Sequence, residues 1–183
     1  LESVCKVVAA YQESPRGLGH AVGCGEEAVG EEPFAVMLPD DLVFDSTPAL
    51  KKLTDVYEAT GKGVVLLMEV PREDTQRYGV VEGTVQTDGT LLIRDMVEKP
   101  HPDNAPSNWA IVGRYVFPPG FCARIRATPP GALNEIQLTD AIAELAAAGR
   151  AVGEVTSACV SPTEGPIGLG FVRRTSAEPG TEL

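Results

Sequence analysis

The sequence predicts an α/β fold in which a mostly parallel sheet is covered by helices and carries an inserted hairpin. Strand-like and helix-like segments alternate along the chain, and the strand-like segments are continuously apolar, as in sheets that are buried on both faces. Thr87-Asp88-Gly89 lies between two strand-like runs and indicates the hairpin. Because ligands of such sheets bind beyond the carboxyl ends of the strands, we expect functional residues in the loops that follow them.

Local patterns predict four elements in the first part of the chain. Residues 7–11 form a short apolar run typical of a strand, and a helix pattern follows at residues 21–29. Residues 34–38 have the pattern of a buried strand. Residues 50–57 gather their apolar side chains on one face, which predicts an amphipathic helix that ends at Gly61.

The later elements are predicted in the same way. Residues 138–148 are rich in Ala, Leu and Glu and predict a helix. The remaining patterns are those of strands, at residues 63–70, 80–85, 91–97 and 109–117. After residue 160 the composition gives only a weak signal for regular structure. We therefore expect a domain over residues 1–160 and a divergent tail over residues 161–183.

Composition limits the class of protein. The chain has 183 residues, 43% of them hydrophobic, which is enough for one buried core. Its net charge of -11 argues against nucleic-acid and membrane-surface partners, because both need a basic face. The cysteines have no paired spacing, so neither zinc nor a disulfide framework is indicated. We therefore expect a cytoplasmic protein with reduced thiols.

Two predicted loops contain residues suited to a nucleotide and a metal ion. Gln12 can pair with an amide-like base edge, and Gly17 lets the backbone approach a flat ligand, although this loop taken alone favours an ordinary strand–helix turn. Asp40 and Asp41 follow a buried strand, where a carboxylate can hold Mg²⁺ while the ion keeps its waters and bridges phosphates. The alternative is a solvated turn whose aspartate caps the next element.

A second pair of loops suits a sugar phosphate. Gly79 begins a predicted strand and lets a sugar ring lie against the backbone, or merely starts the strand. Glu98 and Lys99 stand before Pro100, which turns the chain and allows both side chains to face a cleft. A contact from Lys99 to a phosphate would contribute about 1.5–3 kcal/mol, against about 1 kcal/mol or less for an exposed ion pair.

Taken together, these segments resemble bacterial UTP–glucose-1-phosphate uridylyltransferases. The resemblance covers residues 11–145, and the order and spacing of the motifs agree. It is carried by PRGLGHAV (15–22), LPDDL (38–42), YGVV (78–81), MVEKP with APSN and IVGRY (96–115), and NEIQLTDAI (134–142). The family implies a Rossmann-like nucleotidyltransferase fold and the formation of UDP-glucose and pyrophosphate from UTP and glucose 1-phosphate with Mg²⁺.

The resemblance also implies roles for individual residues. Gln12 and Gly17 would contact the uracil, and Asp40 would hold the metal ion. The family completes its metal site with an aspartate in a YDxGxxxGY-like segment, and residues 163–171 match that segment here with Glu164 at the position of the aspartate.

On the sugar side, Gly79 and Glu98 would contact the glucose, and Lys99 would contact its phosphate. Lys99 and Asp40 are thus the predicted catalytic residues.

The chain departs from the family in one further respect. The GxGTRxxP-type loop and the nearby lysine, which hold the triphosphate in the family, are not present in these 183 residues. We therefore expect the central and C-terminal part of an enzyme, with little or no turnover by itself. The resemblance also implies that the full-length enzyme forms homo-oligomers. Two alternatives stay open: a related thymidylyltransferase, and a non-catalytic remnant that binds nucleotide sugars.

Overall fold

The computed structural model describes residues 6–41, 43, 47–149, 151–155, 160–161 and 165–166. At its N-terminal side, residues 6–17 form no helix or strand, so the strand predicted at residues 7–11 is wrong. Val7, Val8 and Tyr11 are 75%, 56% and 82% exposed. This segment pairs with no strand in the described ranges, and an apolar run becomes a strand only where a neighbouring strand completes its hydrogen bonds.

The helix predicted at residues 21–29 is present as two short helices. These are α1 (Leu18–Gly23) and α2 (Glu26–Val29), which are separated by Cys24 and Gly25. A new helix begins directly after Gly25: the Gly25 carbonyl accepts the first backbone hydrogen bond of α2, from the Ala28 N–H.

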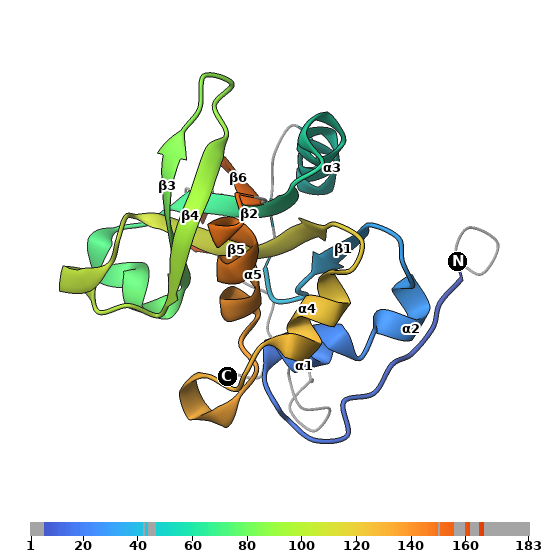
Figure 1. The fold of residues 1–183 in the computed structure, drawn as a ribbon. Coiled ribbons are helices and arrows are strands. Elements are labelled where there is room, and N and C mark those ends of the chain that lie inside the picture. The colour runs from blue at the N-terminus through green and yellow to red at the C-terminus, as the bar shows by residue number, and fades with distance from the viewer. Residues whose placement is uncertain are drawn as a thin grey trace.

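A six-stranded sheet forms the centre of the molecule (Figure 1). Its strands, in spatial order, are β1 (Phe34–Met37), β5 (Trp109–Phe117), β2 (Gly63–Glu69), β6 (Ala151–Val155), β4 (Leu91–Glu98) and β3 (Gly79–Val85). The α/β class is confirmed, and so is the hairpin, which β3 and β4 form. A separate pair joins β7 (Val160–Ser161) to β8 (Gly165–Pro166).

The prediction that the sheet is mostly parallel needs correction. Among the described strands, β2 and β6 form a parallel pair, whereas the other pairs of the six-stranded sheet are antiparallel. β1, β2 and β6 run in one direction, but β5 lies antiparallel between β1 and β2. An apolar run reports burial on both faces, and a central strand is buried in this way whichever direction it takes.

Helices cover the two faces of the sheet, as Figure 1 shows. On one face, α3 (Ala49–Thr60) buries Leu53 against side chains of β2 and β5. On the other face lie α5 (Leu138–Ala147) and α4 (Phe121–Ala127). The sequence patterns predicted α5 but not α4. The ring of Phe121 in α4 stacks on that of Phe117 at the end of β5, with 3.9 Å between centroids.

Turn residues end the predicted elements where expected. Gly61 follows α3 in the left-handed region at φ 64°, where glycine has no steric penalty. In the hairpin turn, Gly89 has φ 86° and the Thr90 N–H donates to Asp88 Oδ1 at 2.9 Å. Short 3₁₀ turns complete the fold: η1 (Arg72–Arg77), η2 (Pro102–Asn104) and η3 (Ala132–Asn134).

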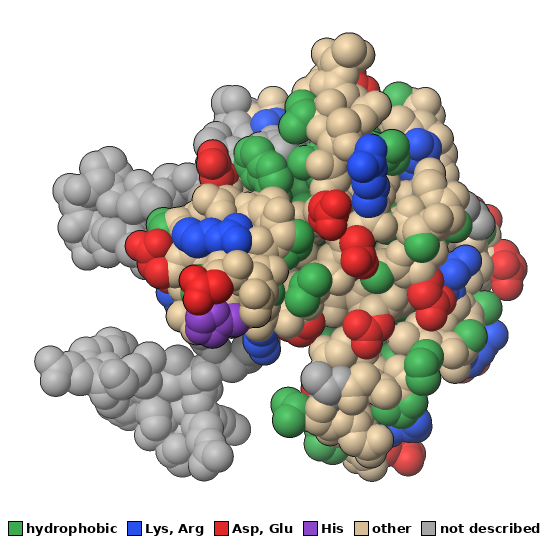
Figure 2. All heavy atoms as spheres, turned by 60° about the vertical axis from the view of Figure 1, so that its left-hand side comes forward, with side chains coloured by type: hydrophobic (Ala, Val, Ile, Leu, Met, Phe, Trp, Pro, Cys, Tyr) green, Lys and Arg blue, Asp and Glu red, His purple; other side chains and the backbone are tan. Residues whose placement is uncertain are grey.

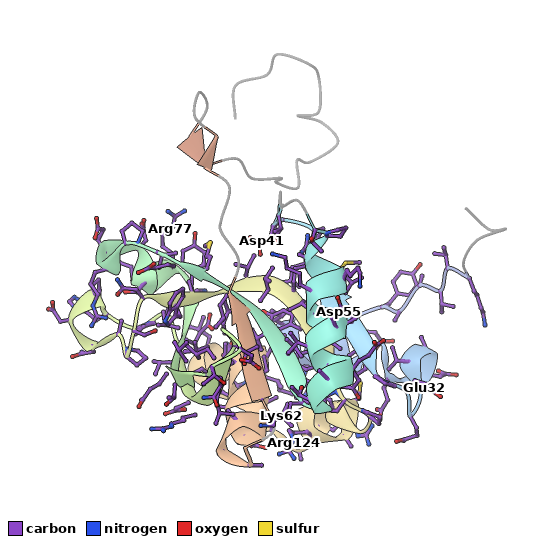
Figure 3. All side chains as sticks on the ribbon, turned by 90° about the horizontal axis from the view of Figure 1, so that it is seen from above. Glu32, Asp41, Asp55, Lys62, Arg77 and Arg124 are labelled. Atoms are coloured by element: carbon purple, nitrogen blue, oxygen red, sulfur yellow. The ribbon has the colours of Figure 1, made fainter. Side chains whose placement is uncertain are left out.

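The strand directions place the carboxyl ends of β1 and β2 on one side of the molecule. Asp41 follows β1, Arg77 follows β2, and Lys62 precedes β2. In Figure 3, Asp41 and Arg77 lie on one side, and Lys62 lies on the opposite side. The side that carries Asp41 is therefore where a ligand is expected. None of the helices in the described ranges has the length and apolarity needed to cross a membrane.

Candidate functional site

A cleft of about 400 Å³ opens on the side that carries Asp41. The motif segments identified in the sequence, except APSN (105–108), contribute to its wall. The lining residues are Leu18, Leu38, Asp40, Asp41, Arg77, Tyr78, Glu98, Lys99, Ile111, Gly113, Tyr115, Glu135, Gln137, Leu138 and Thr139. Asp40 and Lys99, which are far apart in the sequence, thus face a common cavity.

Glu98 and Lys99 reach the cleft through a turn in the backbone. β4 ends at Glu98, and Lys99 takes φ 46°, in the left-handed region that non-glycine residues seldom adopt. The Lys99 N–H donates to the Tyr78 carbonyl at 3.0 Å, which holds this turn against the start of β3. Both side chains therefore line the cleft, with Lys99 Nζ 3.7 Å from Glu98 Oε1.

The Glu98–Lys99 pair leaves the ammonium group available to a ligand. The Lys99 side chain is 64% exposed, and an exposed pair at this distance contributes about 1 kcal/mol or less. A phosphate in the cleft can replace the Glu98 carboxylate as the partner of Lys99 at little cost.

Gly79 lies beside Glu98 because the two residues are directly paired in the β3–β4 register. A Cβ atom at Gly79 would meet Thr139 Cγ2 at 2.9 Å, Ile111 Cδ1 at 3.0 Å and Glu98 Oε2 at 3.3 Å. A side chain would displace part of the wall, so glycine is required here by close packing rather than by a positive φ.

The two aspartates after β1 have different surroundings. Asp41 Oδ2 accepts the Gly113 N–H at 2.9 Å. Asp40 is exposed and makes no hydrogen bond or ion pair with another described residue. Its carboxylate is thus the one available to a ligand.

The donor set suits a magnesium ion that is shared with a substrate. Within the described ranges, no group of three His, Cys, Asp or Glu side chains is placed to hold a metal ion by itself. Mg²⁺ commonly needs only one or two carboxylates, because it keeps several waters and takes the rest of its ligands from phosphates. Asp40 at the cleft meets that requirement.

Tyr115 and Arg77 are among the lining residues to which the sequence analysis gave no role. Tyr115 is buried, which raises the pKa of its phenol, and the negative charges of Asp41, Glu98 and Asp40 raise that pKa further. Arg77 lies over the Tyr78 ring, 5.9 Å from its centroid, and forms an exposed ion pair with Asp74. The available sequence signals were the position of Arg77 next to the YGVV motif and that of Tyr115 within IVGRY.

The charges in the cleft are mixed rather than basic. Figure 2 shows the face that carries the β3–β4 hairpin, with Asp and Glu side chains spread over the middle of the surface. In the cleft itself, Arg77 and Lys99 stand against Asp40, Asp41, Glu98 and Glu135. The described lining thus supplies two positively charged side chains against four negatively charged ones, so a bound cation would favour an anionic ligand here.

Gln12 and Gly17 lie beside the cleft and do not line it. Gln12 Nε2 donates to the Gly17 carbonyl at 3.1 Å and lies 2.9 Å from His20 Nδ1. Gly17 has φ 96° and packs so tightly that a Cβ atom would lie 2.7 Å from the Ile136 carbonyl oxygen. Contact of these two residues with uracil stays a prediction. Glu164 lies outside the described residues.

A model of the nucleotidyl transferase family matches residues 2–159, so the chain belongs to that family. Among curated proteins, it is similar to the UTP–glucose-1-phosphate uridylyltransferase of Staphylococcus epidermidis, with 49% identity over 131 residues, which are 72% of this chain and 46% of that protein. The enzyme of the same name from Bacillus subtilis is 46% identical over 134 residues, 73% of this chain and 46% of the relative. The chain thus spans about half the length of these relatives.

Solved structures agree in fold. UDP-glucose pyrophosphorylase complexed with UDP-glucose has a TM-score of 0.76 at 38% identity, covering 81% of this chain and 57% of its own. The UTP-bound enzyme from Acinetobacter baumannii has a TM-score of 0.68 at 36% identity, covering 78% of this chain and 50% of its own. A putative glucose-1-phosphate thymidylyltransferase from Bacillus anthracis, at 24% identity and a TM-score of 0.65, shares the fold alone.

A second family model overlaps the end of the chain. Residues 136–183 match the glycine cleavage T-protein C-terminal barrel domain. The nucleotidyl transferase match ends at residue 159, whereas this second match includes the tail and Glu164. The two matches overlap over residues 136–159, the tail is covered by the second match alone, and a domain boundary at residue 160 stays a prediction.

Proposed function

We propose that this chain forms the hexose-phosphate and metal side of a UTP–glucose-1-phosphate uridylyltransferase. The reaction transfers the uridylyl group of UTP to glucose 1-phosphate and releases UDP-glucose and pyrophosphate. The observation that carries the proposal is the cleft, because segments separated by as much as 121 positions, from Leu18 to Thr139, converge on it. The names of the relatives that share these segments support the choice of substrates.

On the sugar side, Glu98 accepts hydrogen bonds from glucose hydroxyls, and Gly79, which is buried beside Glu98 and does not line the cleft, would contact the glucose only through its backbone. Lys99 contacts the phosphate of glucose 1-phosphate, as its exposed ammonium group allows. The short distance between Glu98 and Lys99 matches a ligand whose hydroxyls and phosphate lie within one small molecule.

On the nucleotide side, Asp40 would hold Mg²⁺, with Glu164 as the candidate for a second ligand, and Gln12 and Gly17 would contact the uracil. Bound Mg²⁺ would supply positive charge where the phosphates of the two substrates meet. Glu164 lies beyond the end of the nucleotidyl transferase match and within the second family match, so it is the least supported of these residues.

The chemistry needs alignment more than proton transfer. A phosphate monoester has its second pKa at about 6, so glucose 1-phosphate is mostly a dianion at neutral pH and attacks the α-phosphorus without a general base. One phosphate oxygen forms the new bond to that phosphorus, and the bond to pyrophosphate breaks. The chain must hold the attacking oxygen in line and neutralise its charge, which Lys99 does from the hexose side.

Binding and turnover test the proposal separately. Calorimetry in the presence of Mg²⁺ is expected to show that the chain binds UDP-glucose and glucose 1-phosphate. Pyrophosphate release from UTP and glucose 1-phosphate is expected to be slow or absent with these 183 residues. The proposal would be refuted if the chain bound neither UDP-glucose nor glucose 1-phosphate. Ordinary turnover would refute the expectation of weak activity.

Competition distinguishes the alternatives. UTP is expected to compete with UDP-glucose more strongly than dTTP does; a preference for dTTP would favour a thymidylyltransferase. UDP-glucose binding without metal-dependent turnover, even after the N-terminal segment of a relative is added, would favour a non-catalytic binding protein. We also infer a cytoplasmic location and a homo-oligomeric full-length enzyme. Sedimentation of the full-length enzyme would test its oligomeric state.

A further inference from the structure

Residues of β5 hold the loop at residues 38–41 by several hydrogen bonds. The Leu38 N–H donates to the Gly113 carbonyl at 2.7 Å, and the Gly113 N–H donates to Asp41 Oδ2 at 2.9 Å. The Arg114 guanidinium donates to the carbonyls of Leu38 and Asp41, and to that of Gly113 at 3.0 Å. The loop is therefore fastened to β5 at both of its ends.

Arg114 suits this position because it is half-buried and has a planar fork of donors. Its contacts join backbone carbonyls that a single ammonium group of lysine does not span at once. These bonds have a charged donor, which makes them stronger than bonds between neutral groups. Arg114 forms no ion pair with the Asp41 carboxylate, which is engaged instead by the Gly113 N–H.

Gly113 allows the loop to lie directly on β5. A Cβ atom there would be 2.6 Å from Asp41 Oδ2 and 2.7 Å from Leu38 Cβ. Any side chain at residue 113 would thus push the loop away from the strand. Asp40 is the residue between the two fastened points whose carboxylate faces the cleft without a described partner.

We propose that Asp41 and Arg114 are positioning residues that fix the loop at residues 38–41 on β5 and thereby set the Asp40 carboxylate in the cleft. The inference rests on the proposed function, in which Asp40 holds the metal ion. It assigns the two adjacent aspartates opposite tasks: Asp41 anchors the loop, and Asp40 contacts the ligand. Loss of the anchor leaves the Asp40 carboxylate present but poorly placed.

The test compares Arg114→Met and Asp41→Ala with a matched control, Arg94→Met, which removes an exposed arginine from the hairpin strand β4, a strand that pairs with neither β1 nor β5. Mn²⁺ serves as the probe, followed by electron paramagnetic resonance in the presence of glucose 1-phosphate. Because residues that orient a metal ligand commonly contribute 10- to 100-fold to metal affinity, both variants are expected to bind Mn²⁺ about 10-fold or more weakly. Arg94→Met is expected to match the wild type.

Two further measurements separate positioning from general destabilisation. Glucose 1-phosphate affinity measured without metal is expected to stay within about twofold of the wild type, because Lys99 lies in the turn after another strand, β4. Amide hydrogen exchange is expected to become faster at residues 38–41 in both variants and to stay unchanged in β4.

The outcomes decide the anchor and the proposed function independently. If the wild type binds Mn²⁺ and both variants bind it equally well, the positioning role is wrong. Loss of both ligands together with faster exchange throughout the sheet would also overturn it, because the residues would then be merely structural. If the wild type binds no Mn²⁺, the metal role of Asp40 is wrong, and amide hydrogen exchange alone tests the anchor. Exchange at residues 38–41 that is as slow in the variants as in the wild type would overturn the anchor, whereas faster exchange in the variants would support it.

Discussion

Replacing Gly79 by alanine perturbs the sugar side of the cleft with a single methyl group. The added Cβ would lie 2.9 Å from Thr139 Cγ2, 3.0 Å from Ile111 Cδ1 and 3.3 Å from Glu98 Oε2. Carbon atoms pack best at about 3.5–4.0 Å, so the two carbon neighbours must each retreat by roughly half an ångström or more. Glu98, whose side chain is 30% exposed, has the most room to move.

This overpacking has a predictable size. Adding a methyl group to a packed site costs about 1–3 kcal/mol. Part of that energy is expected as a lower free energy of unfolding, and part as displacement of Glu98 from its place against the ligand. We expect glucose 1-phosphate to bind about 10-fold more weakly, which corresponds to about 1.4 kcal/mol.

Calorimetry with glucose 1-phosphate and urea unfolding measure the two parts. The matched control is Gly23→Ala in α1, where the new Cβ would meet a single neighbour, Ile125 Cγ2, at 3.3 Å and outside the sugar cleft. That variant is expected to bind glucose 1-phosphate as the wild type does. Wild-type affinity in Gly79→Ala, or an equal loss in Gly23→Ala, would refute the reasoning.

Three further substitutions give separate readouts. Lys99→Ala is expected to weaken glucose 1-phosphate about 10- to 100-fold in calorimetry and UTP far less, because its proposed partner is the sugar phosphate; the control Lys51→Ala removes an ammonium group that is also 64% exposed beside a carboxylate, and equal losses for both ligands would contradict the role. Thr139→Val is expected to raise the free energy of unfolding by about 1 kcal/mol in urea, because the Thr139 hydroxyl is buried without a hydrogen-bond partner among the described residues; a destabilised variant would show that the hydroxyl has a partner. Burial raises the pKa of Tyr115, so the unfolded chain loses the phenolic proton at a lower pH than the folded chain, and the free energy of unfolding of the wild type falls as the pH rises above about 10. Tyr115→Phe is expected to lack this fall and to unfold less readily than the wild type there. Parallel pH profiles of the free energy of unfolding would contradict this.

Elements with a strong local signal were predicted well. The helix α3 follows from an apolar face and a glycine stop, and the β3–β4 hairpin follows from its turn residues. Both signals lie within a few residues of the element they determine. The strand predicted at residues 7–11 is absent because its formation depends on a partner strand, which no property of the run itself supplies.

The site divides in the same way. Asp40, Glu98 and Lys99 were selected from short motifs, and the structure brings them to one cleft. Arg114 was not selected, because its contacts with Leu38 and Asp41 join residues 76 and 73 positions apart. Contacts over that distance depend on β1 and β5 being neighbours, which local patterns do not reveal.

By itself, the sequence determined the α/β class, most strands and helices, and the motifs that predicted a sugar-phosphate site, because each depends on side-chain order over short stretches. The tertiary structure decided the direction of β5, the shared cleft of Asp40 and Lys99, and the different surroundings of Asp40 and Asp41. Strand direction and hydrogen-bond partners follow from which segments pack together, and that choice minimises the free energy of the whole chain rather than of any one segment.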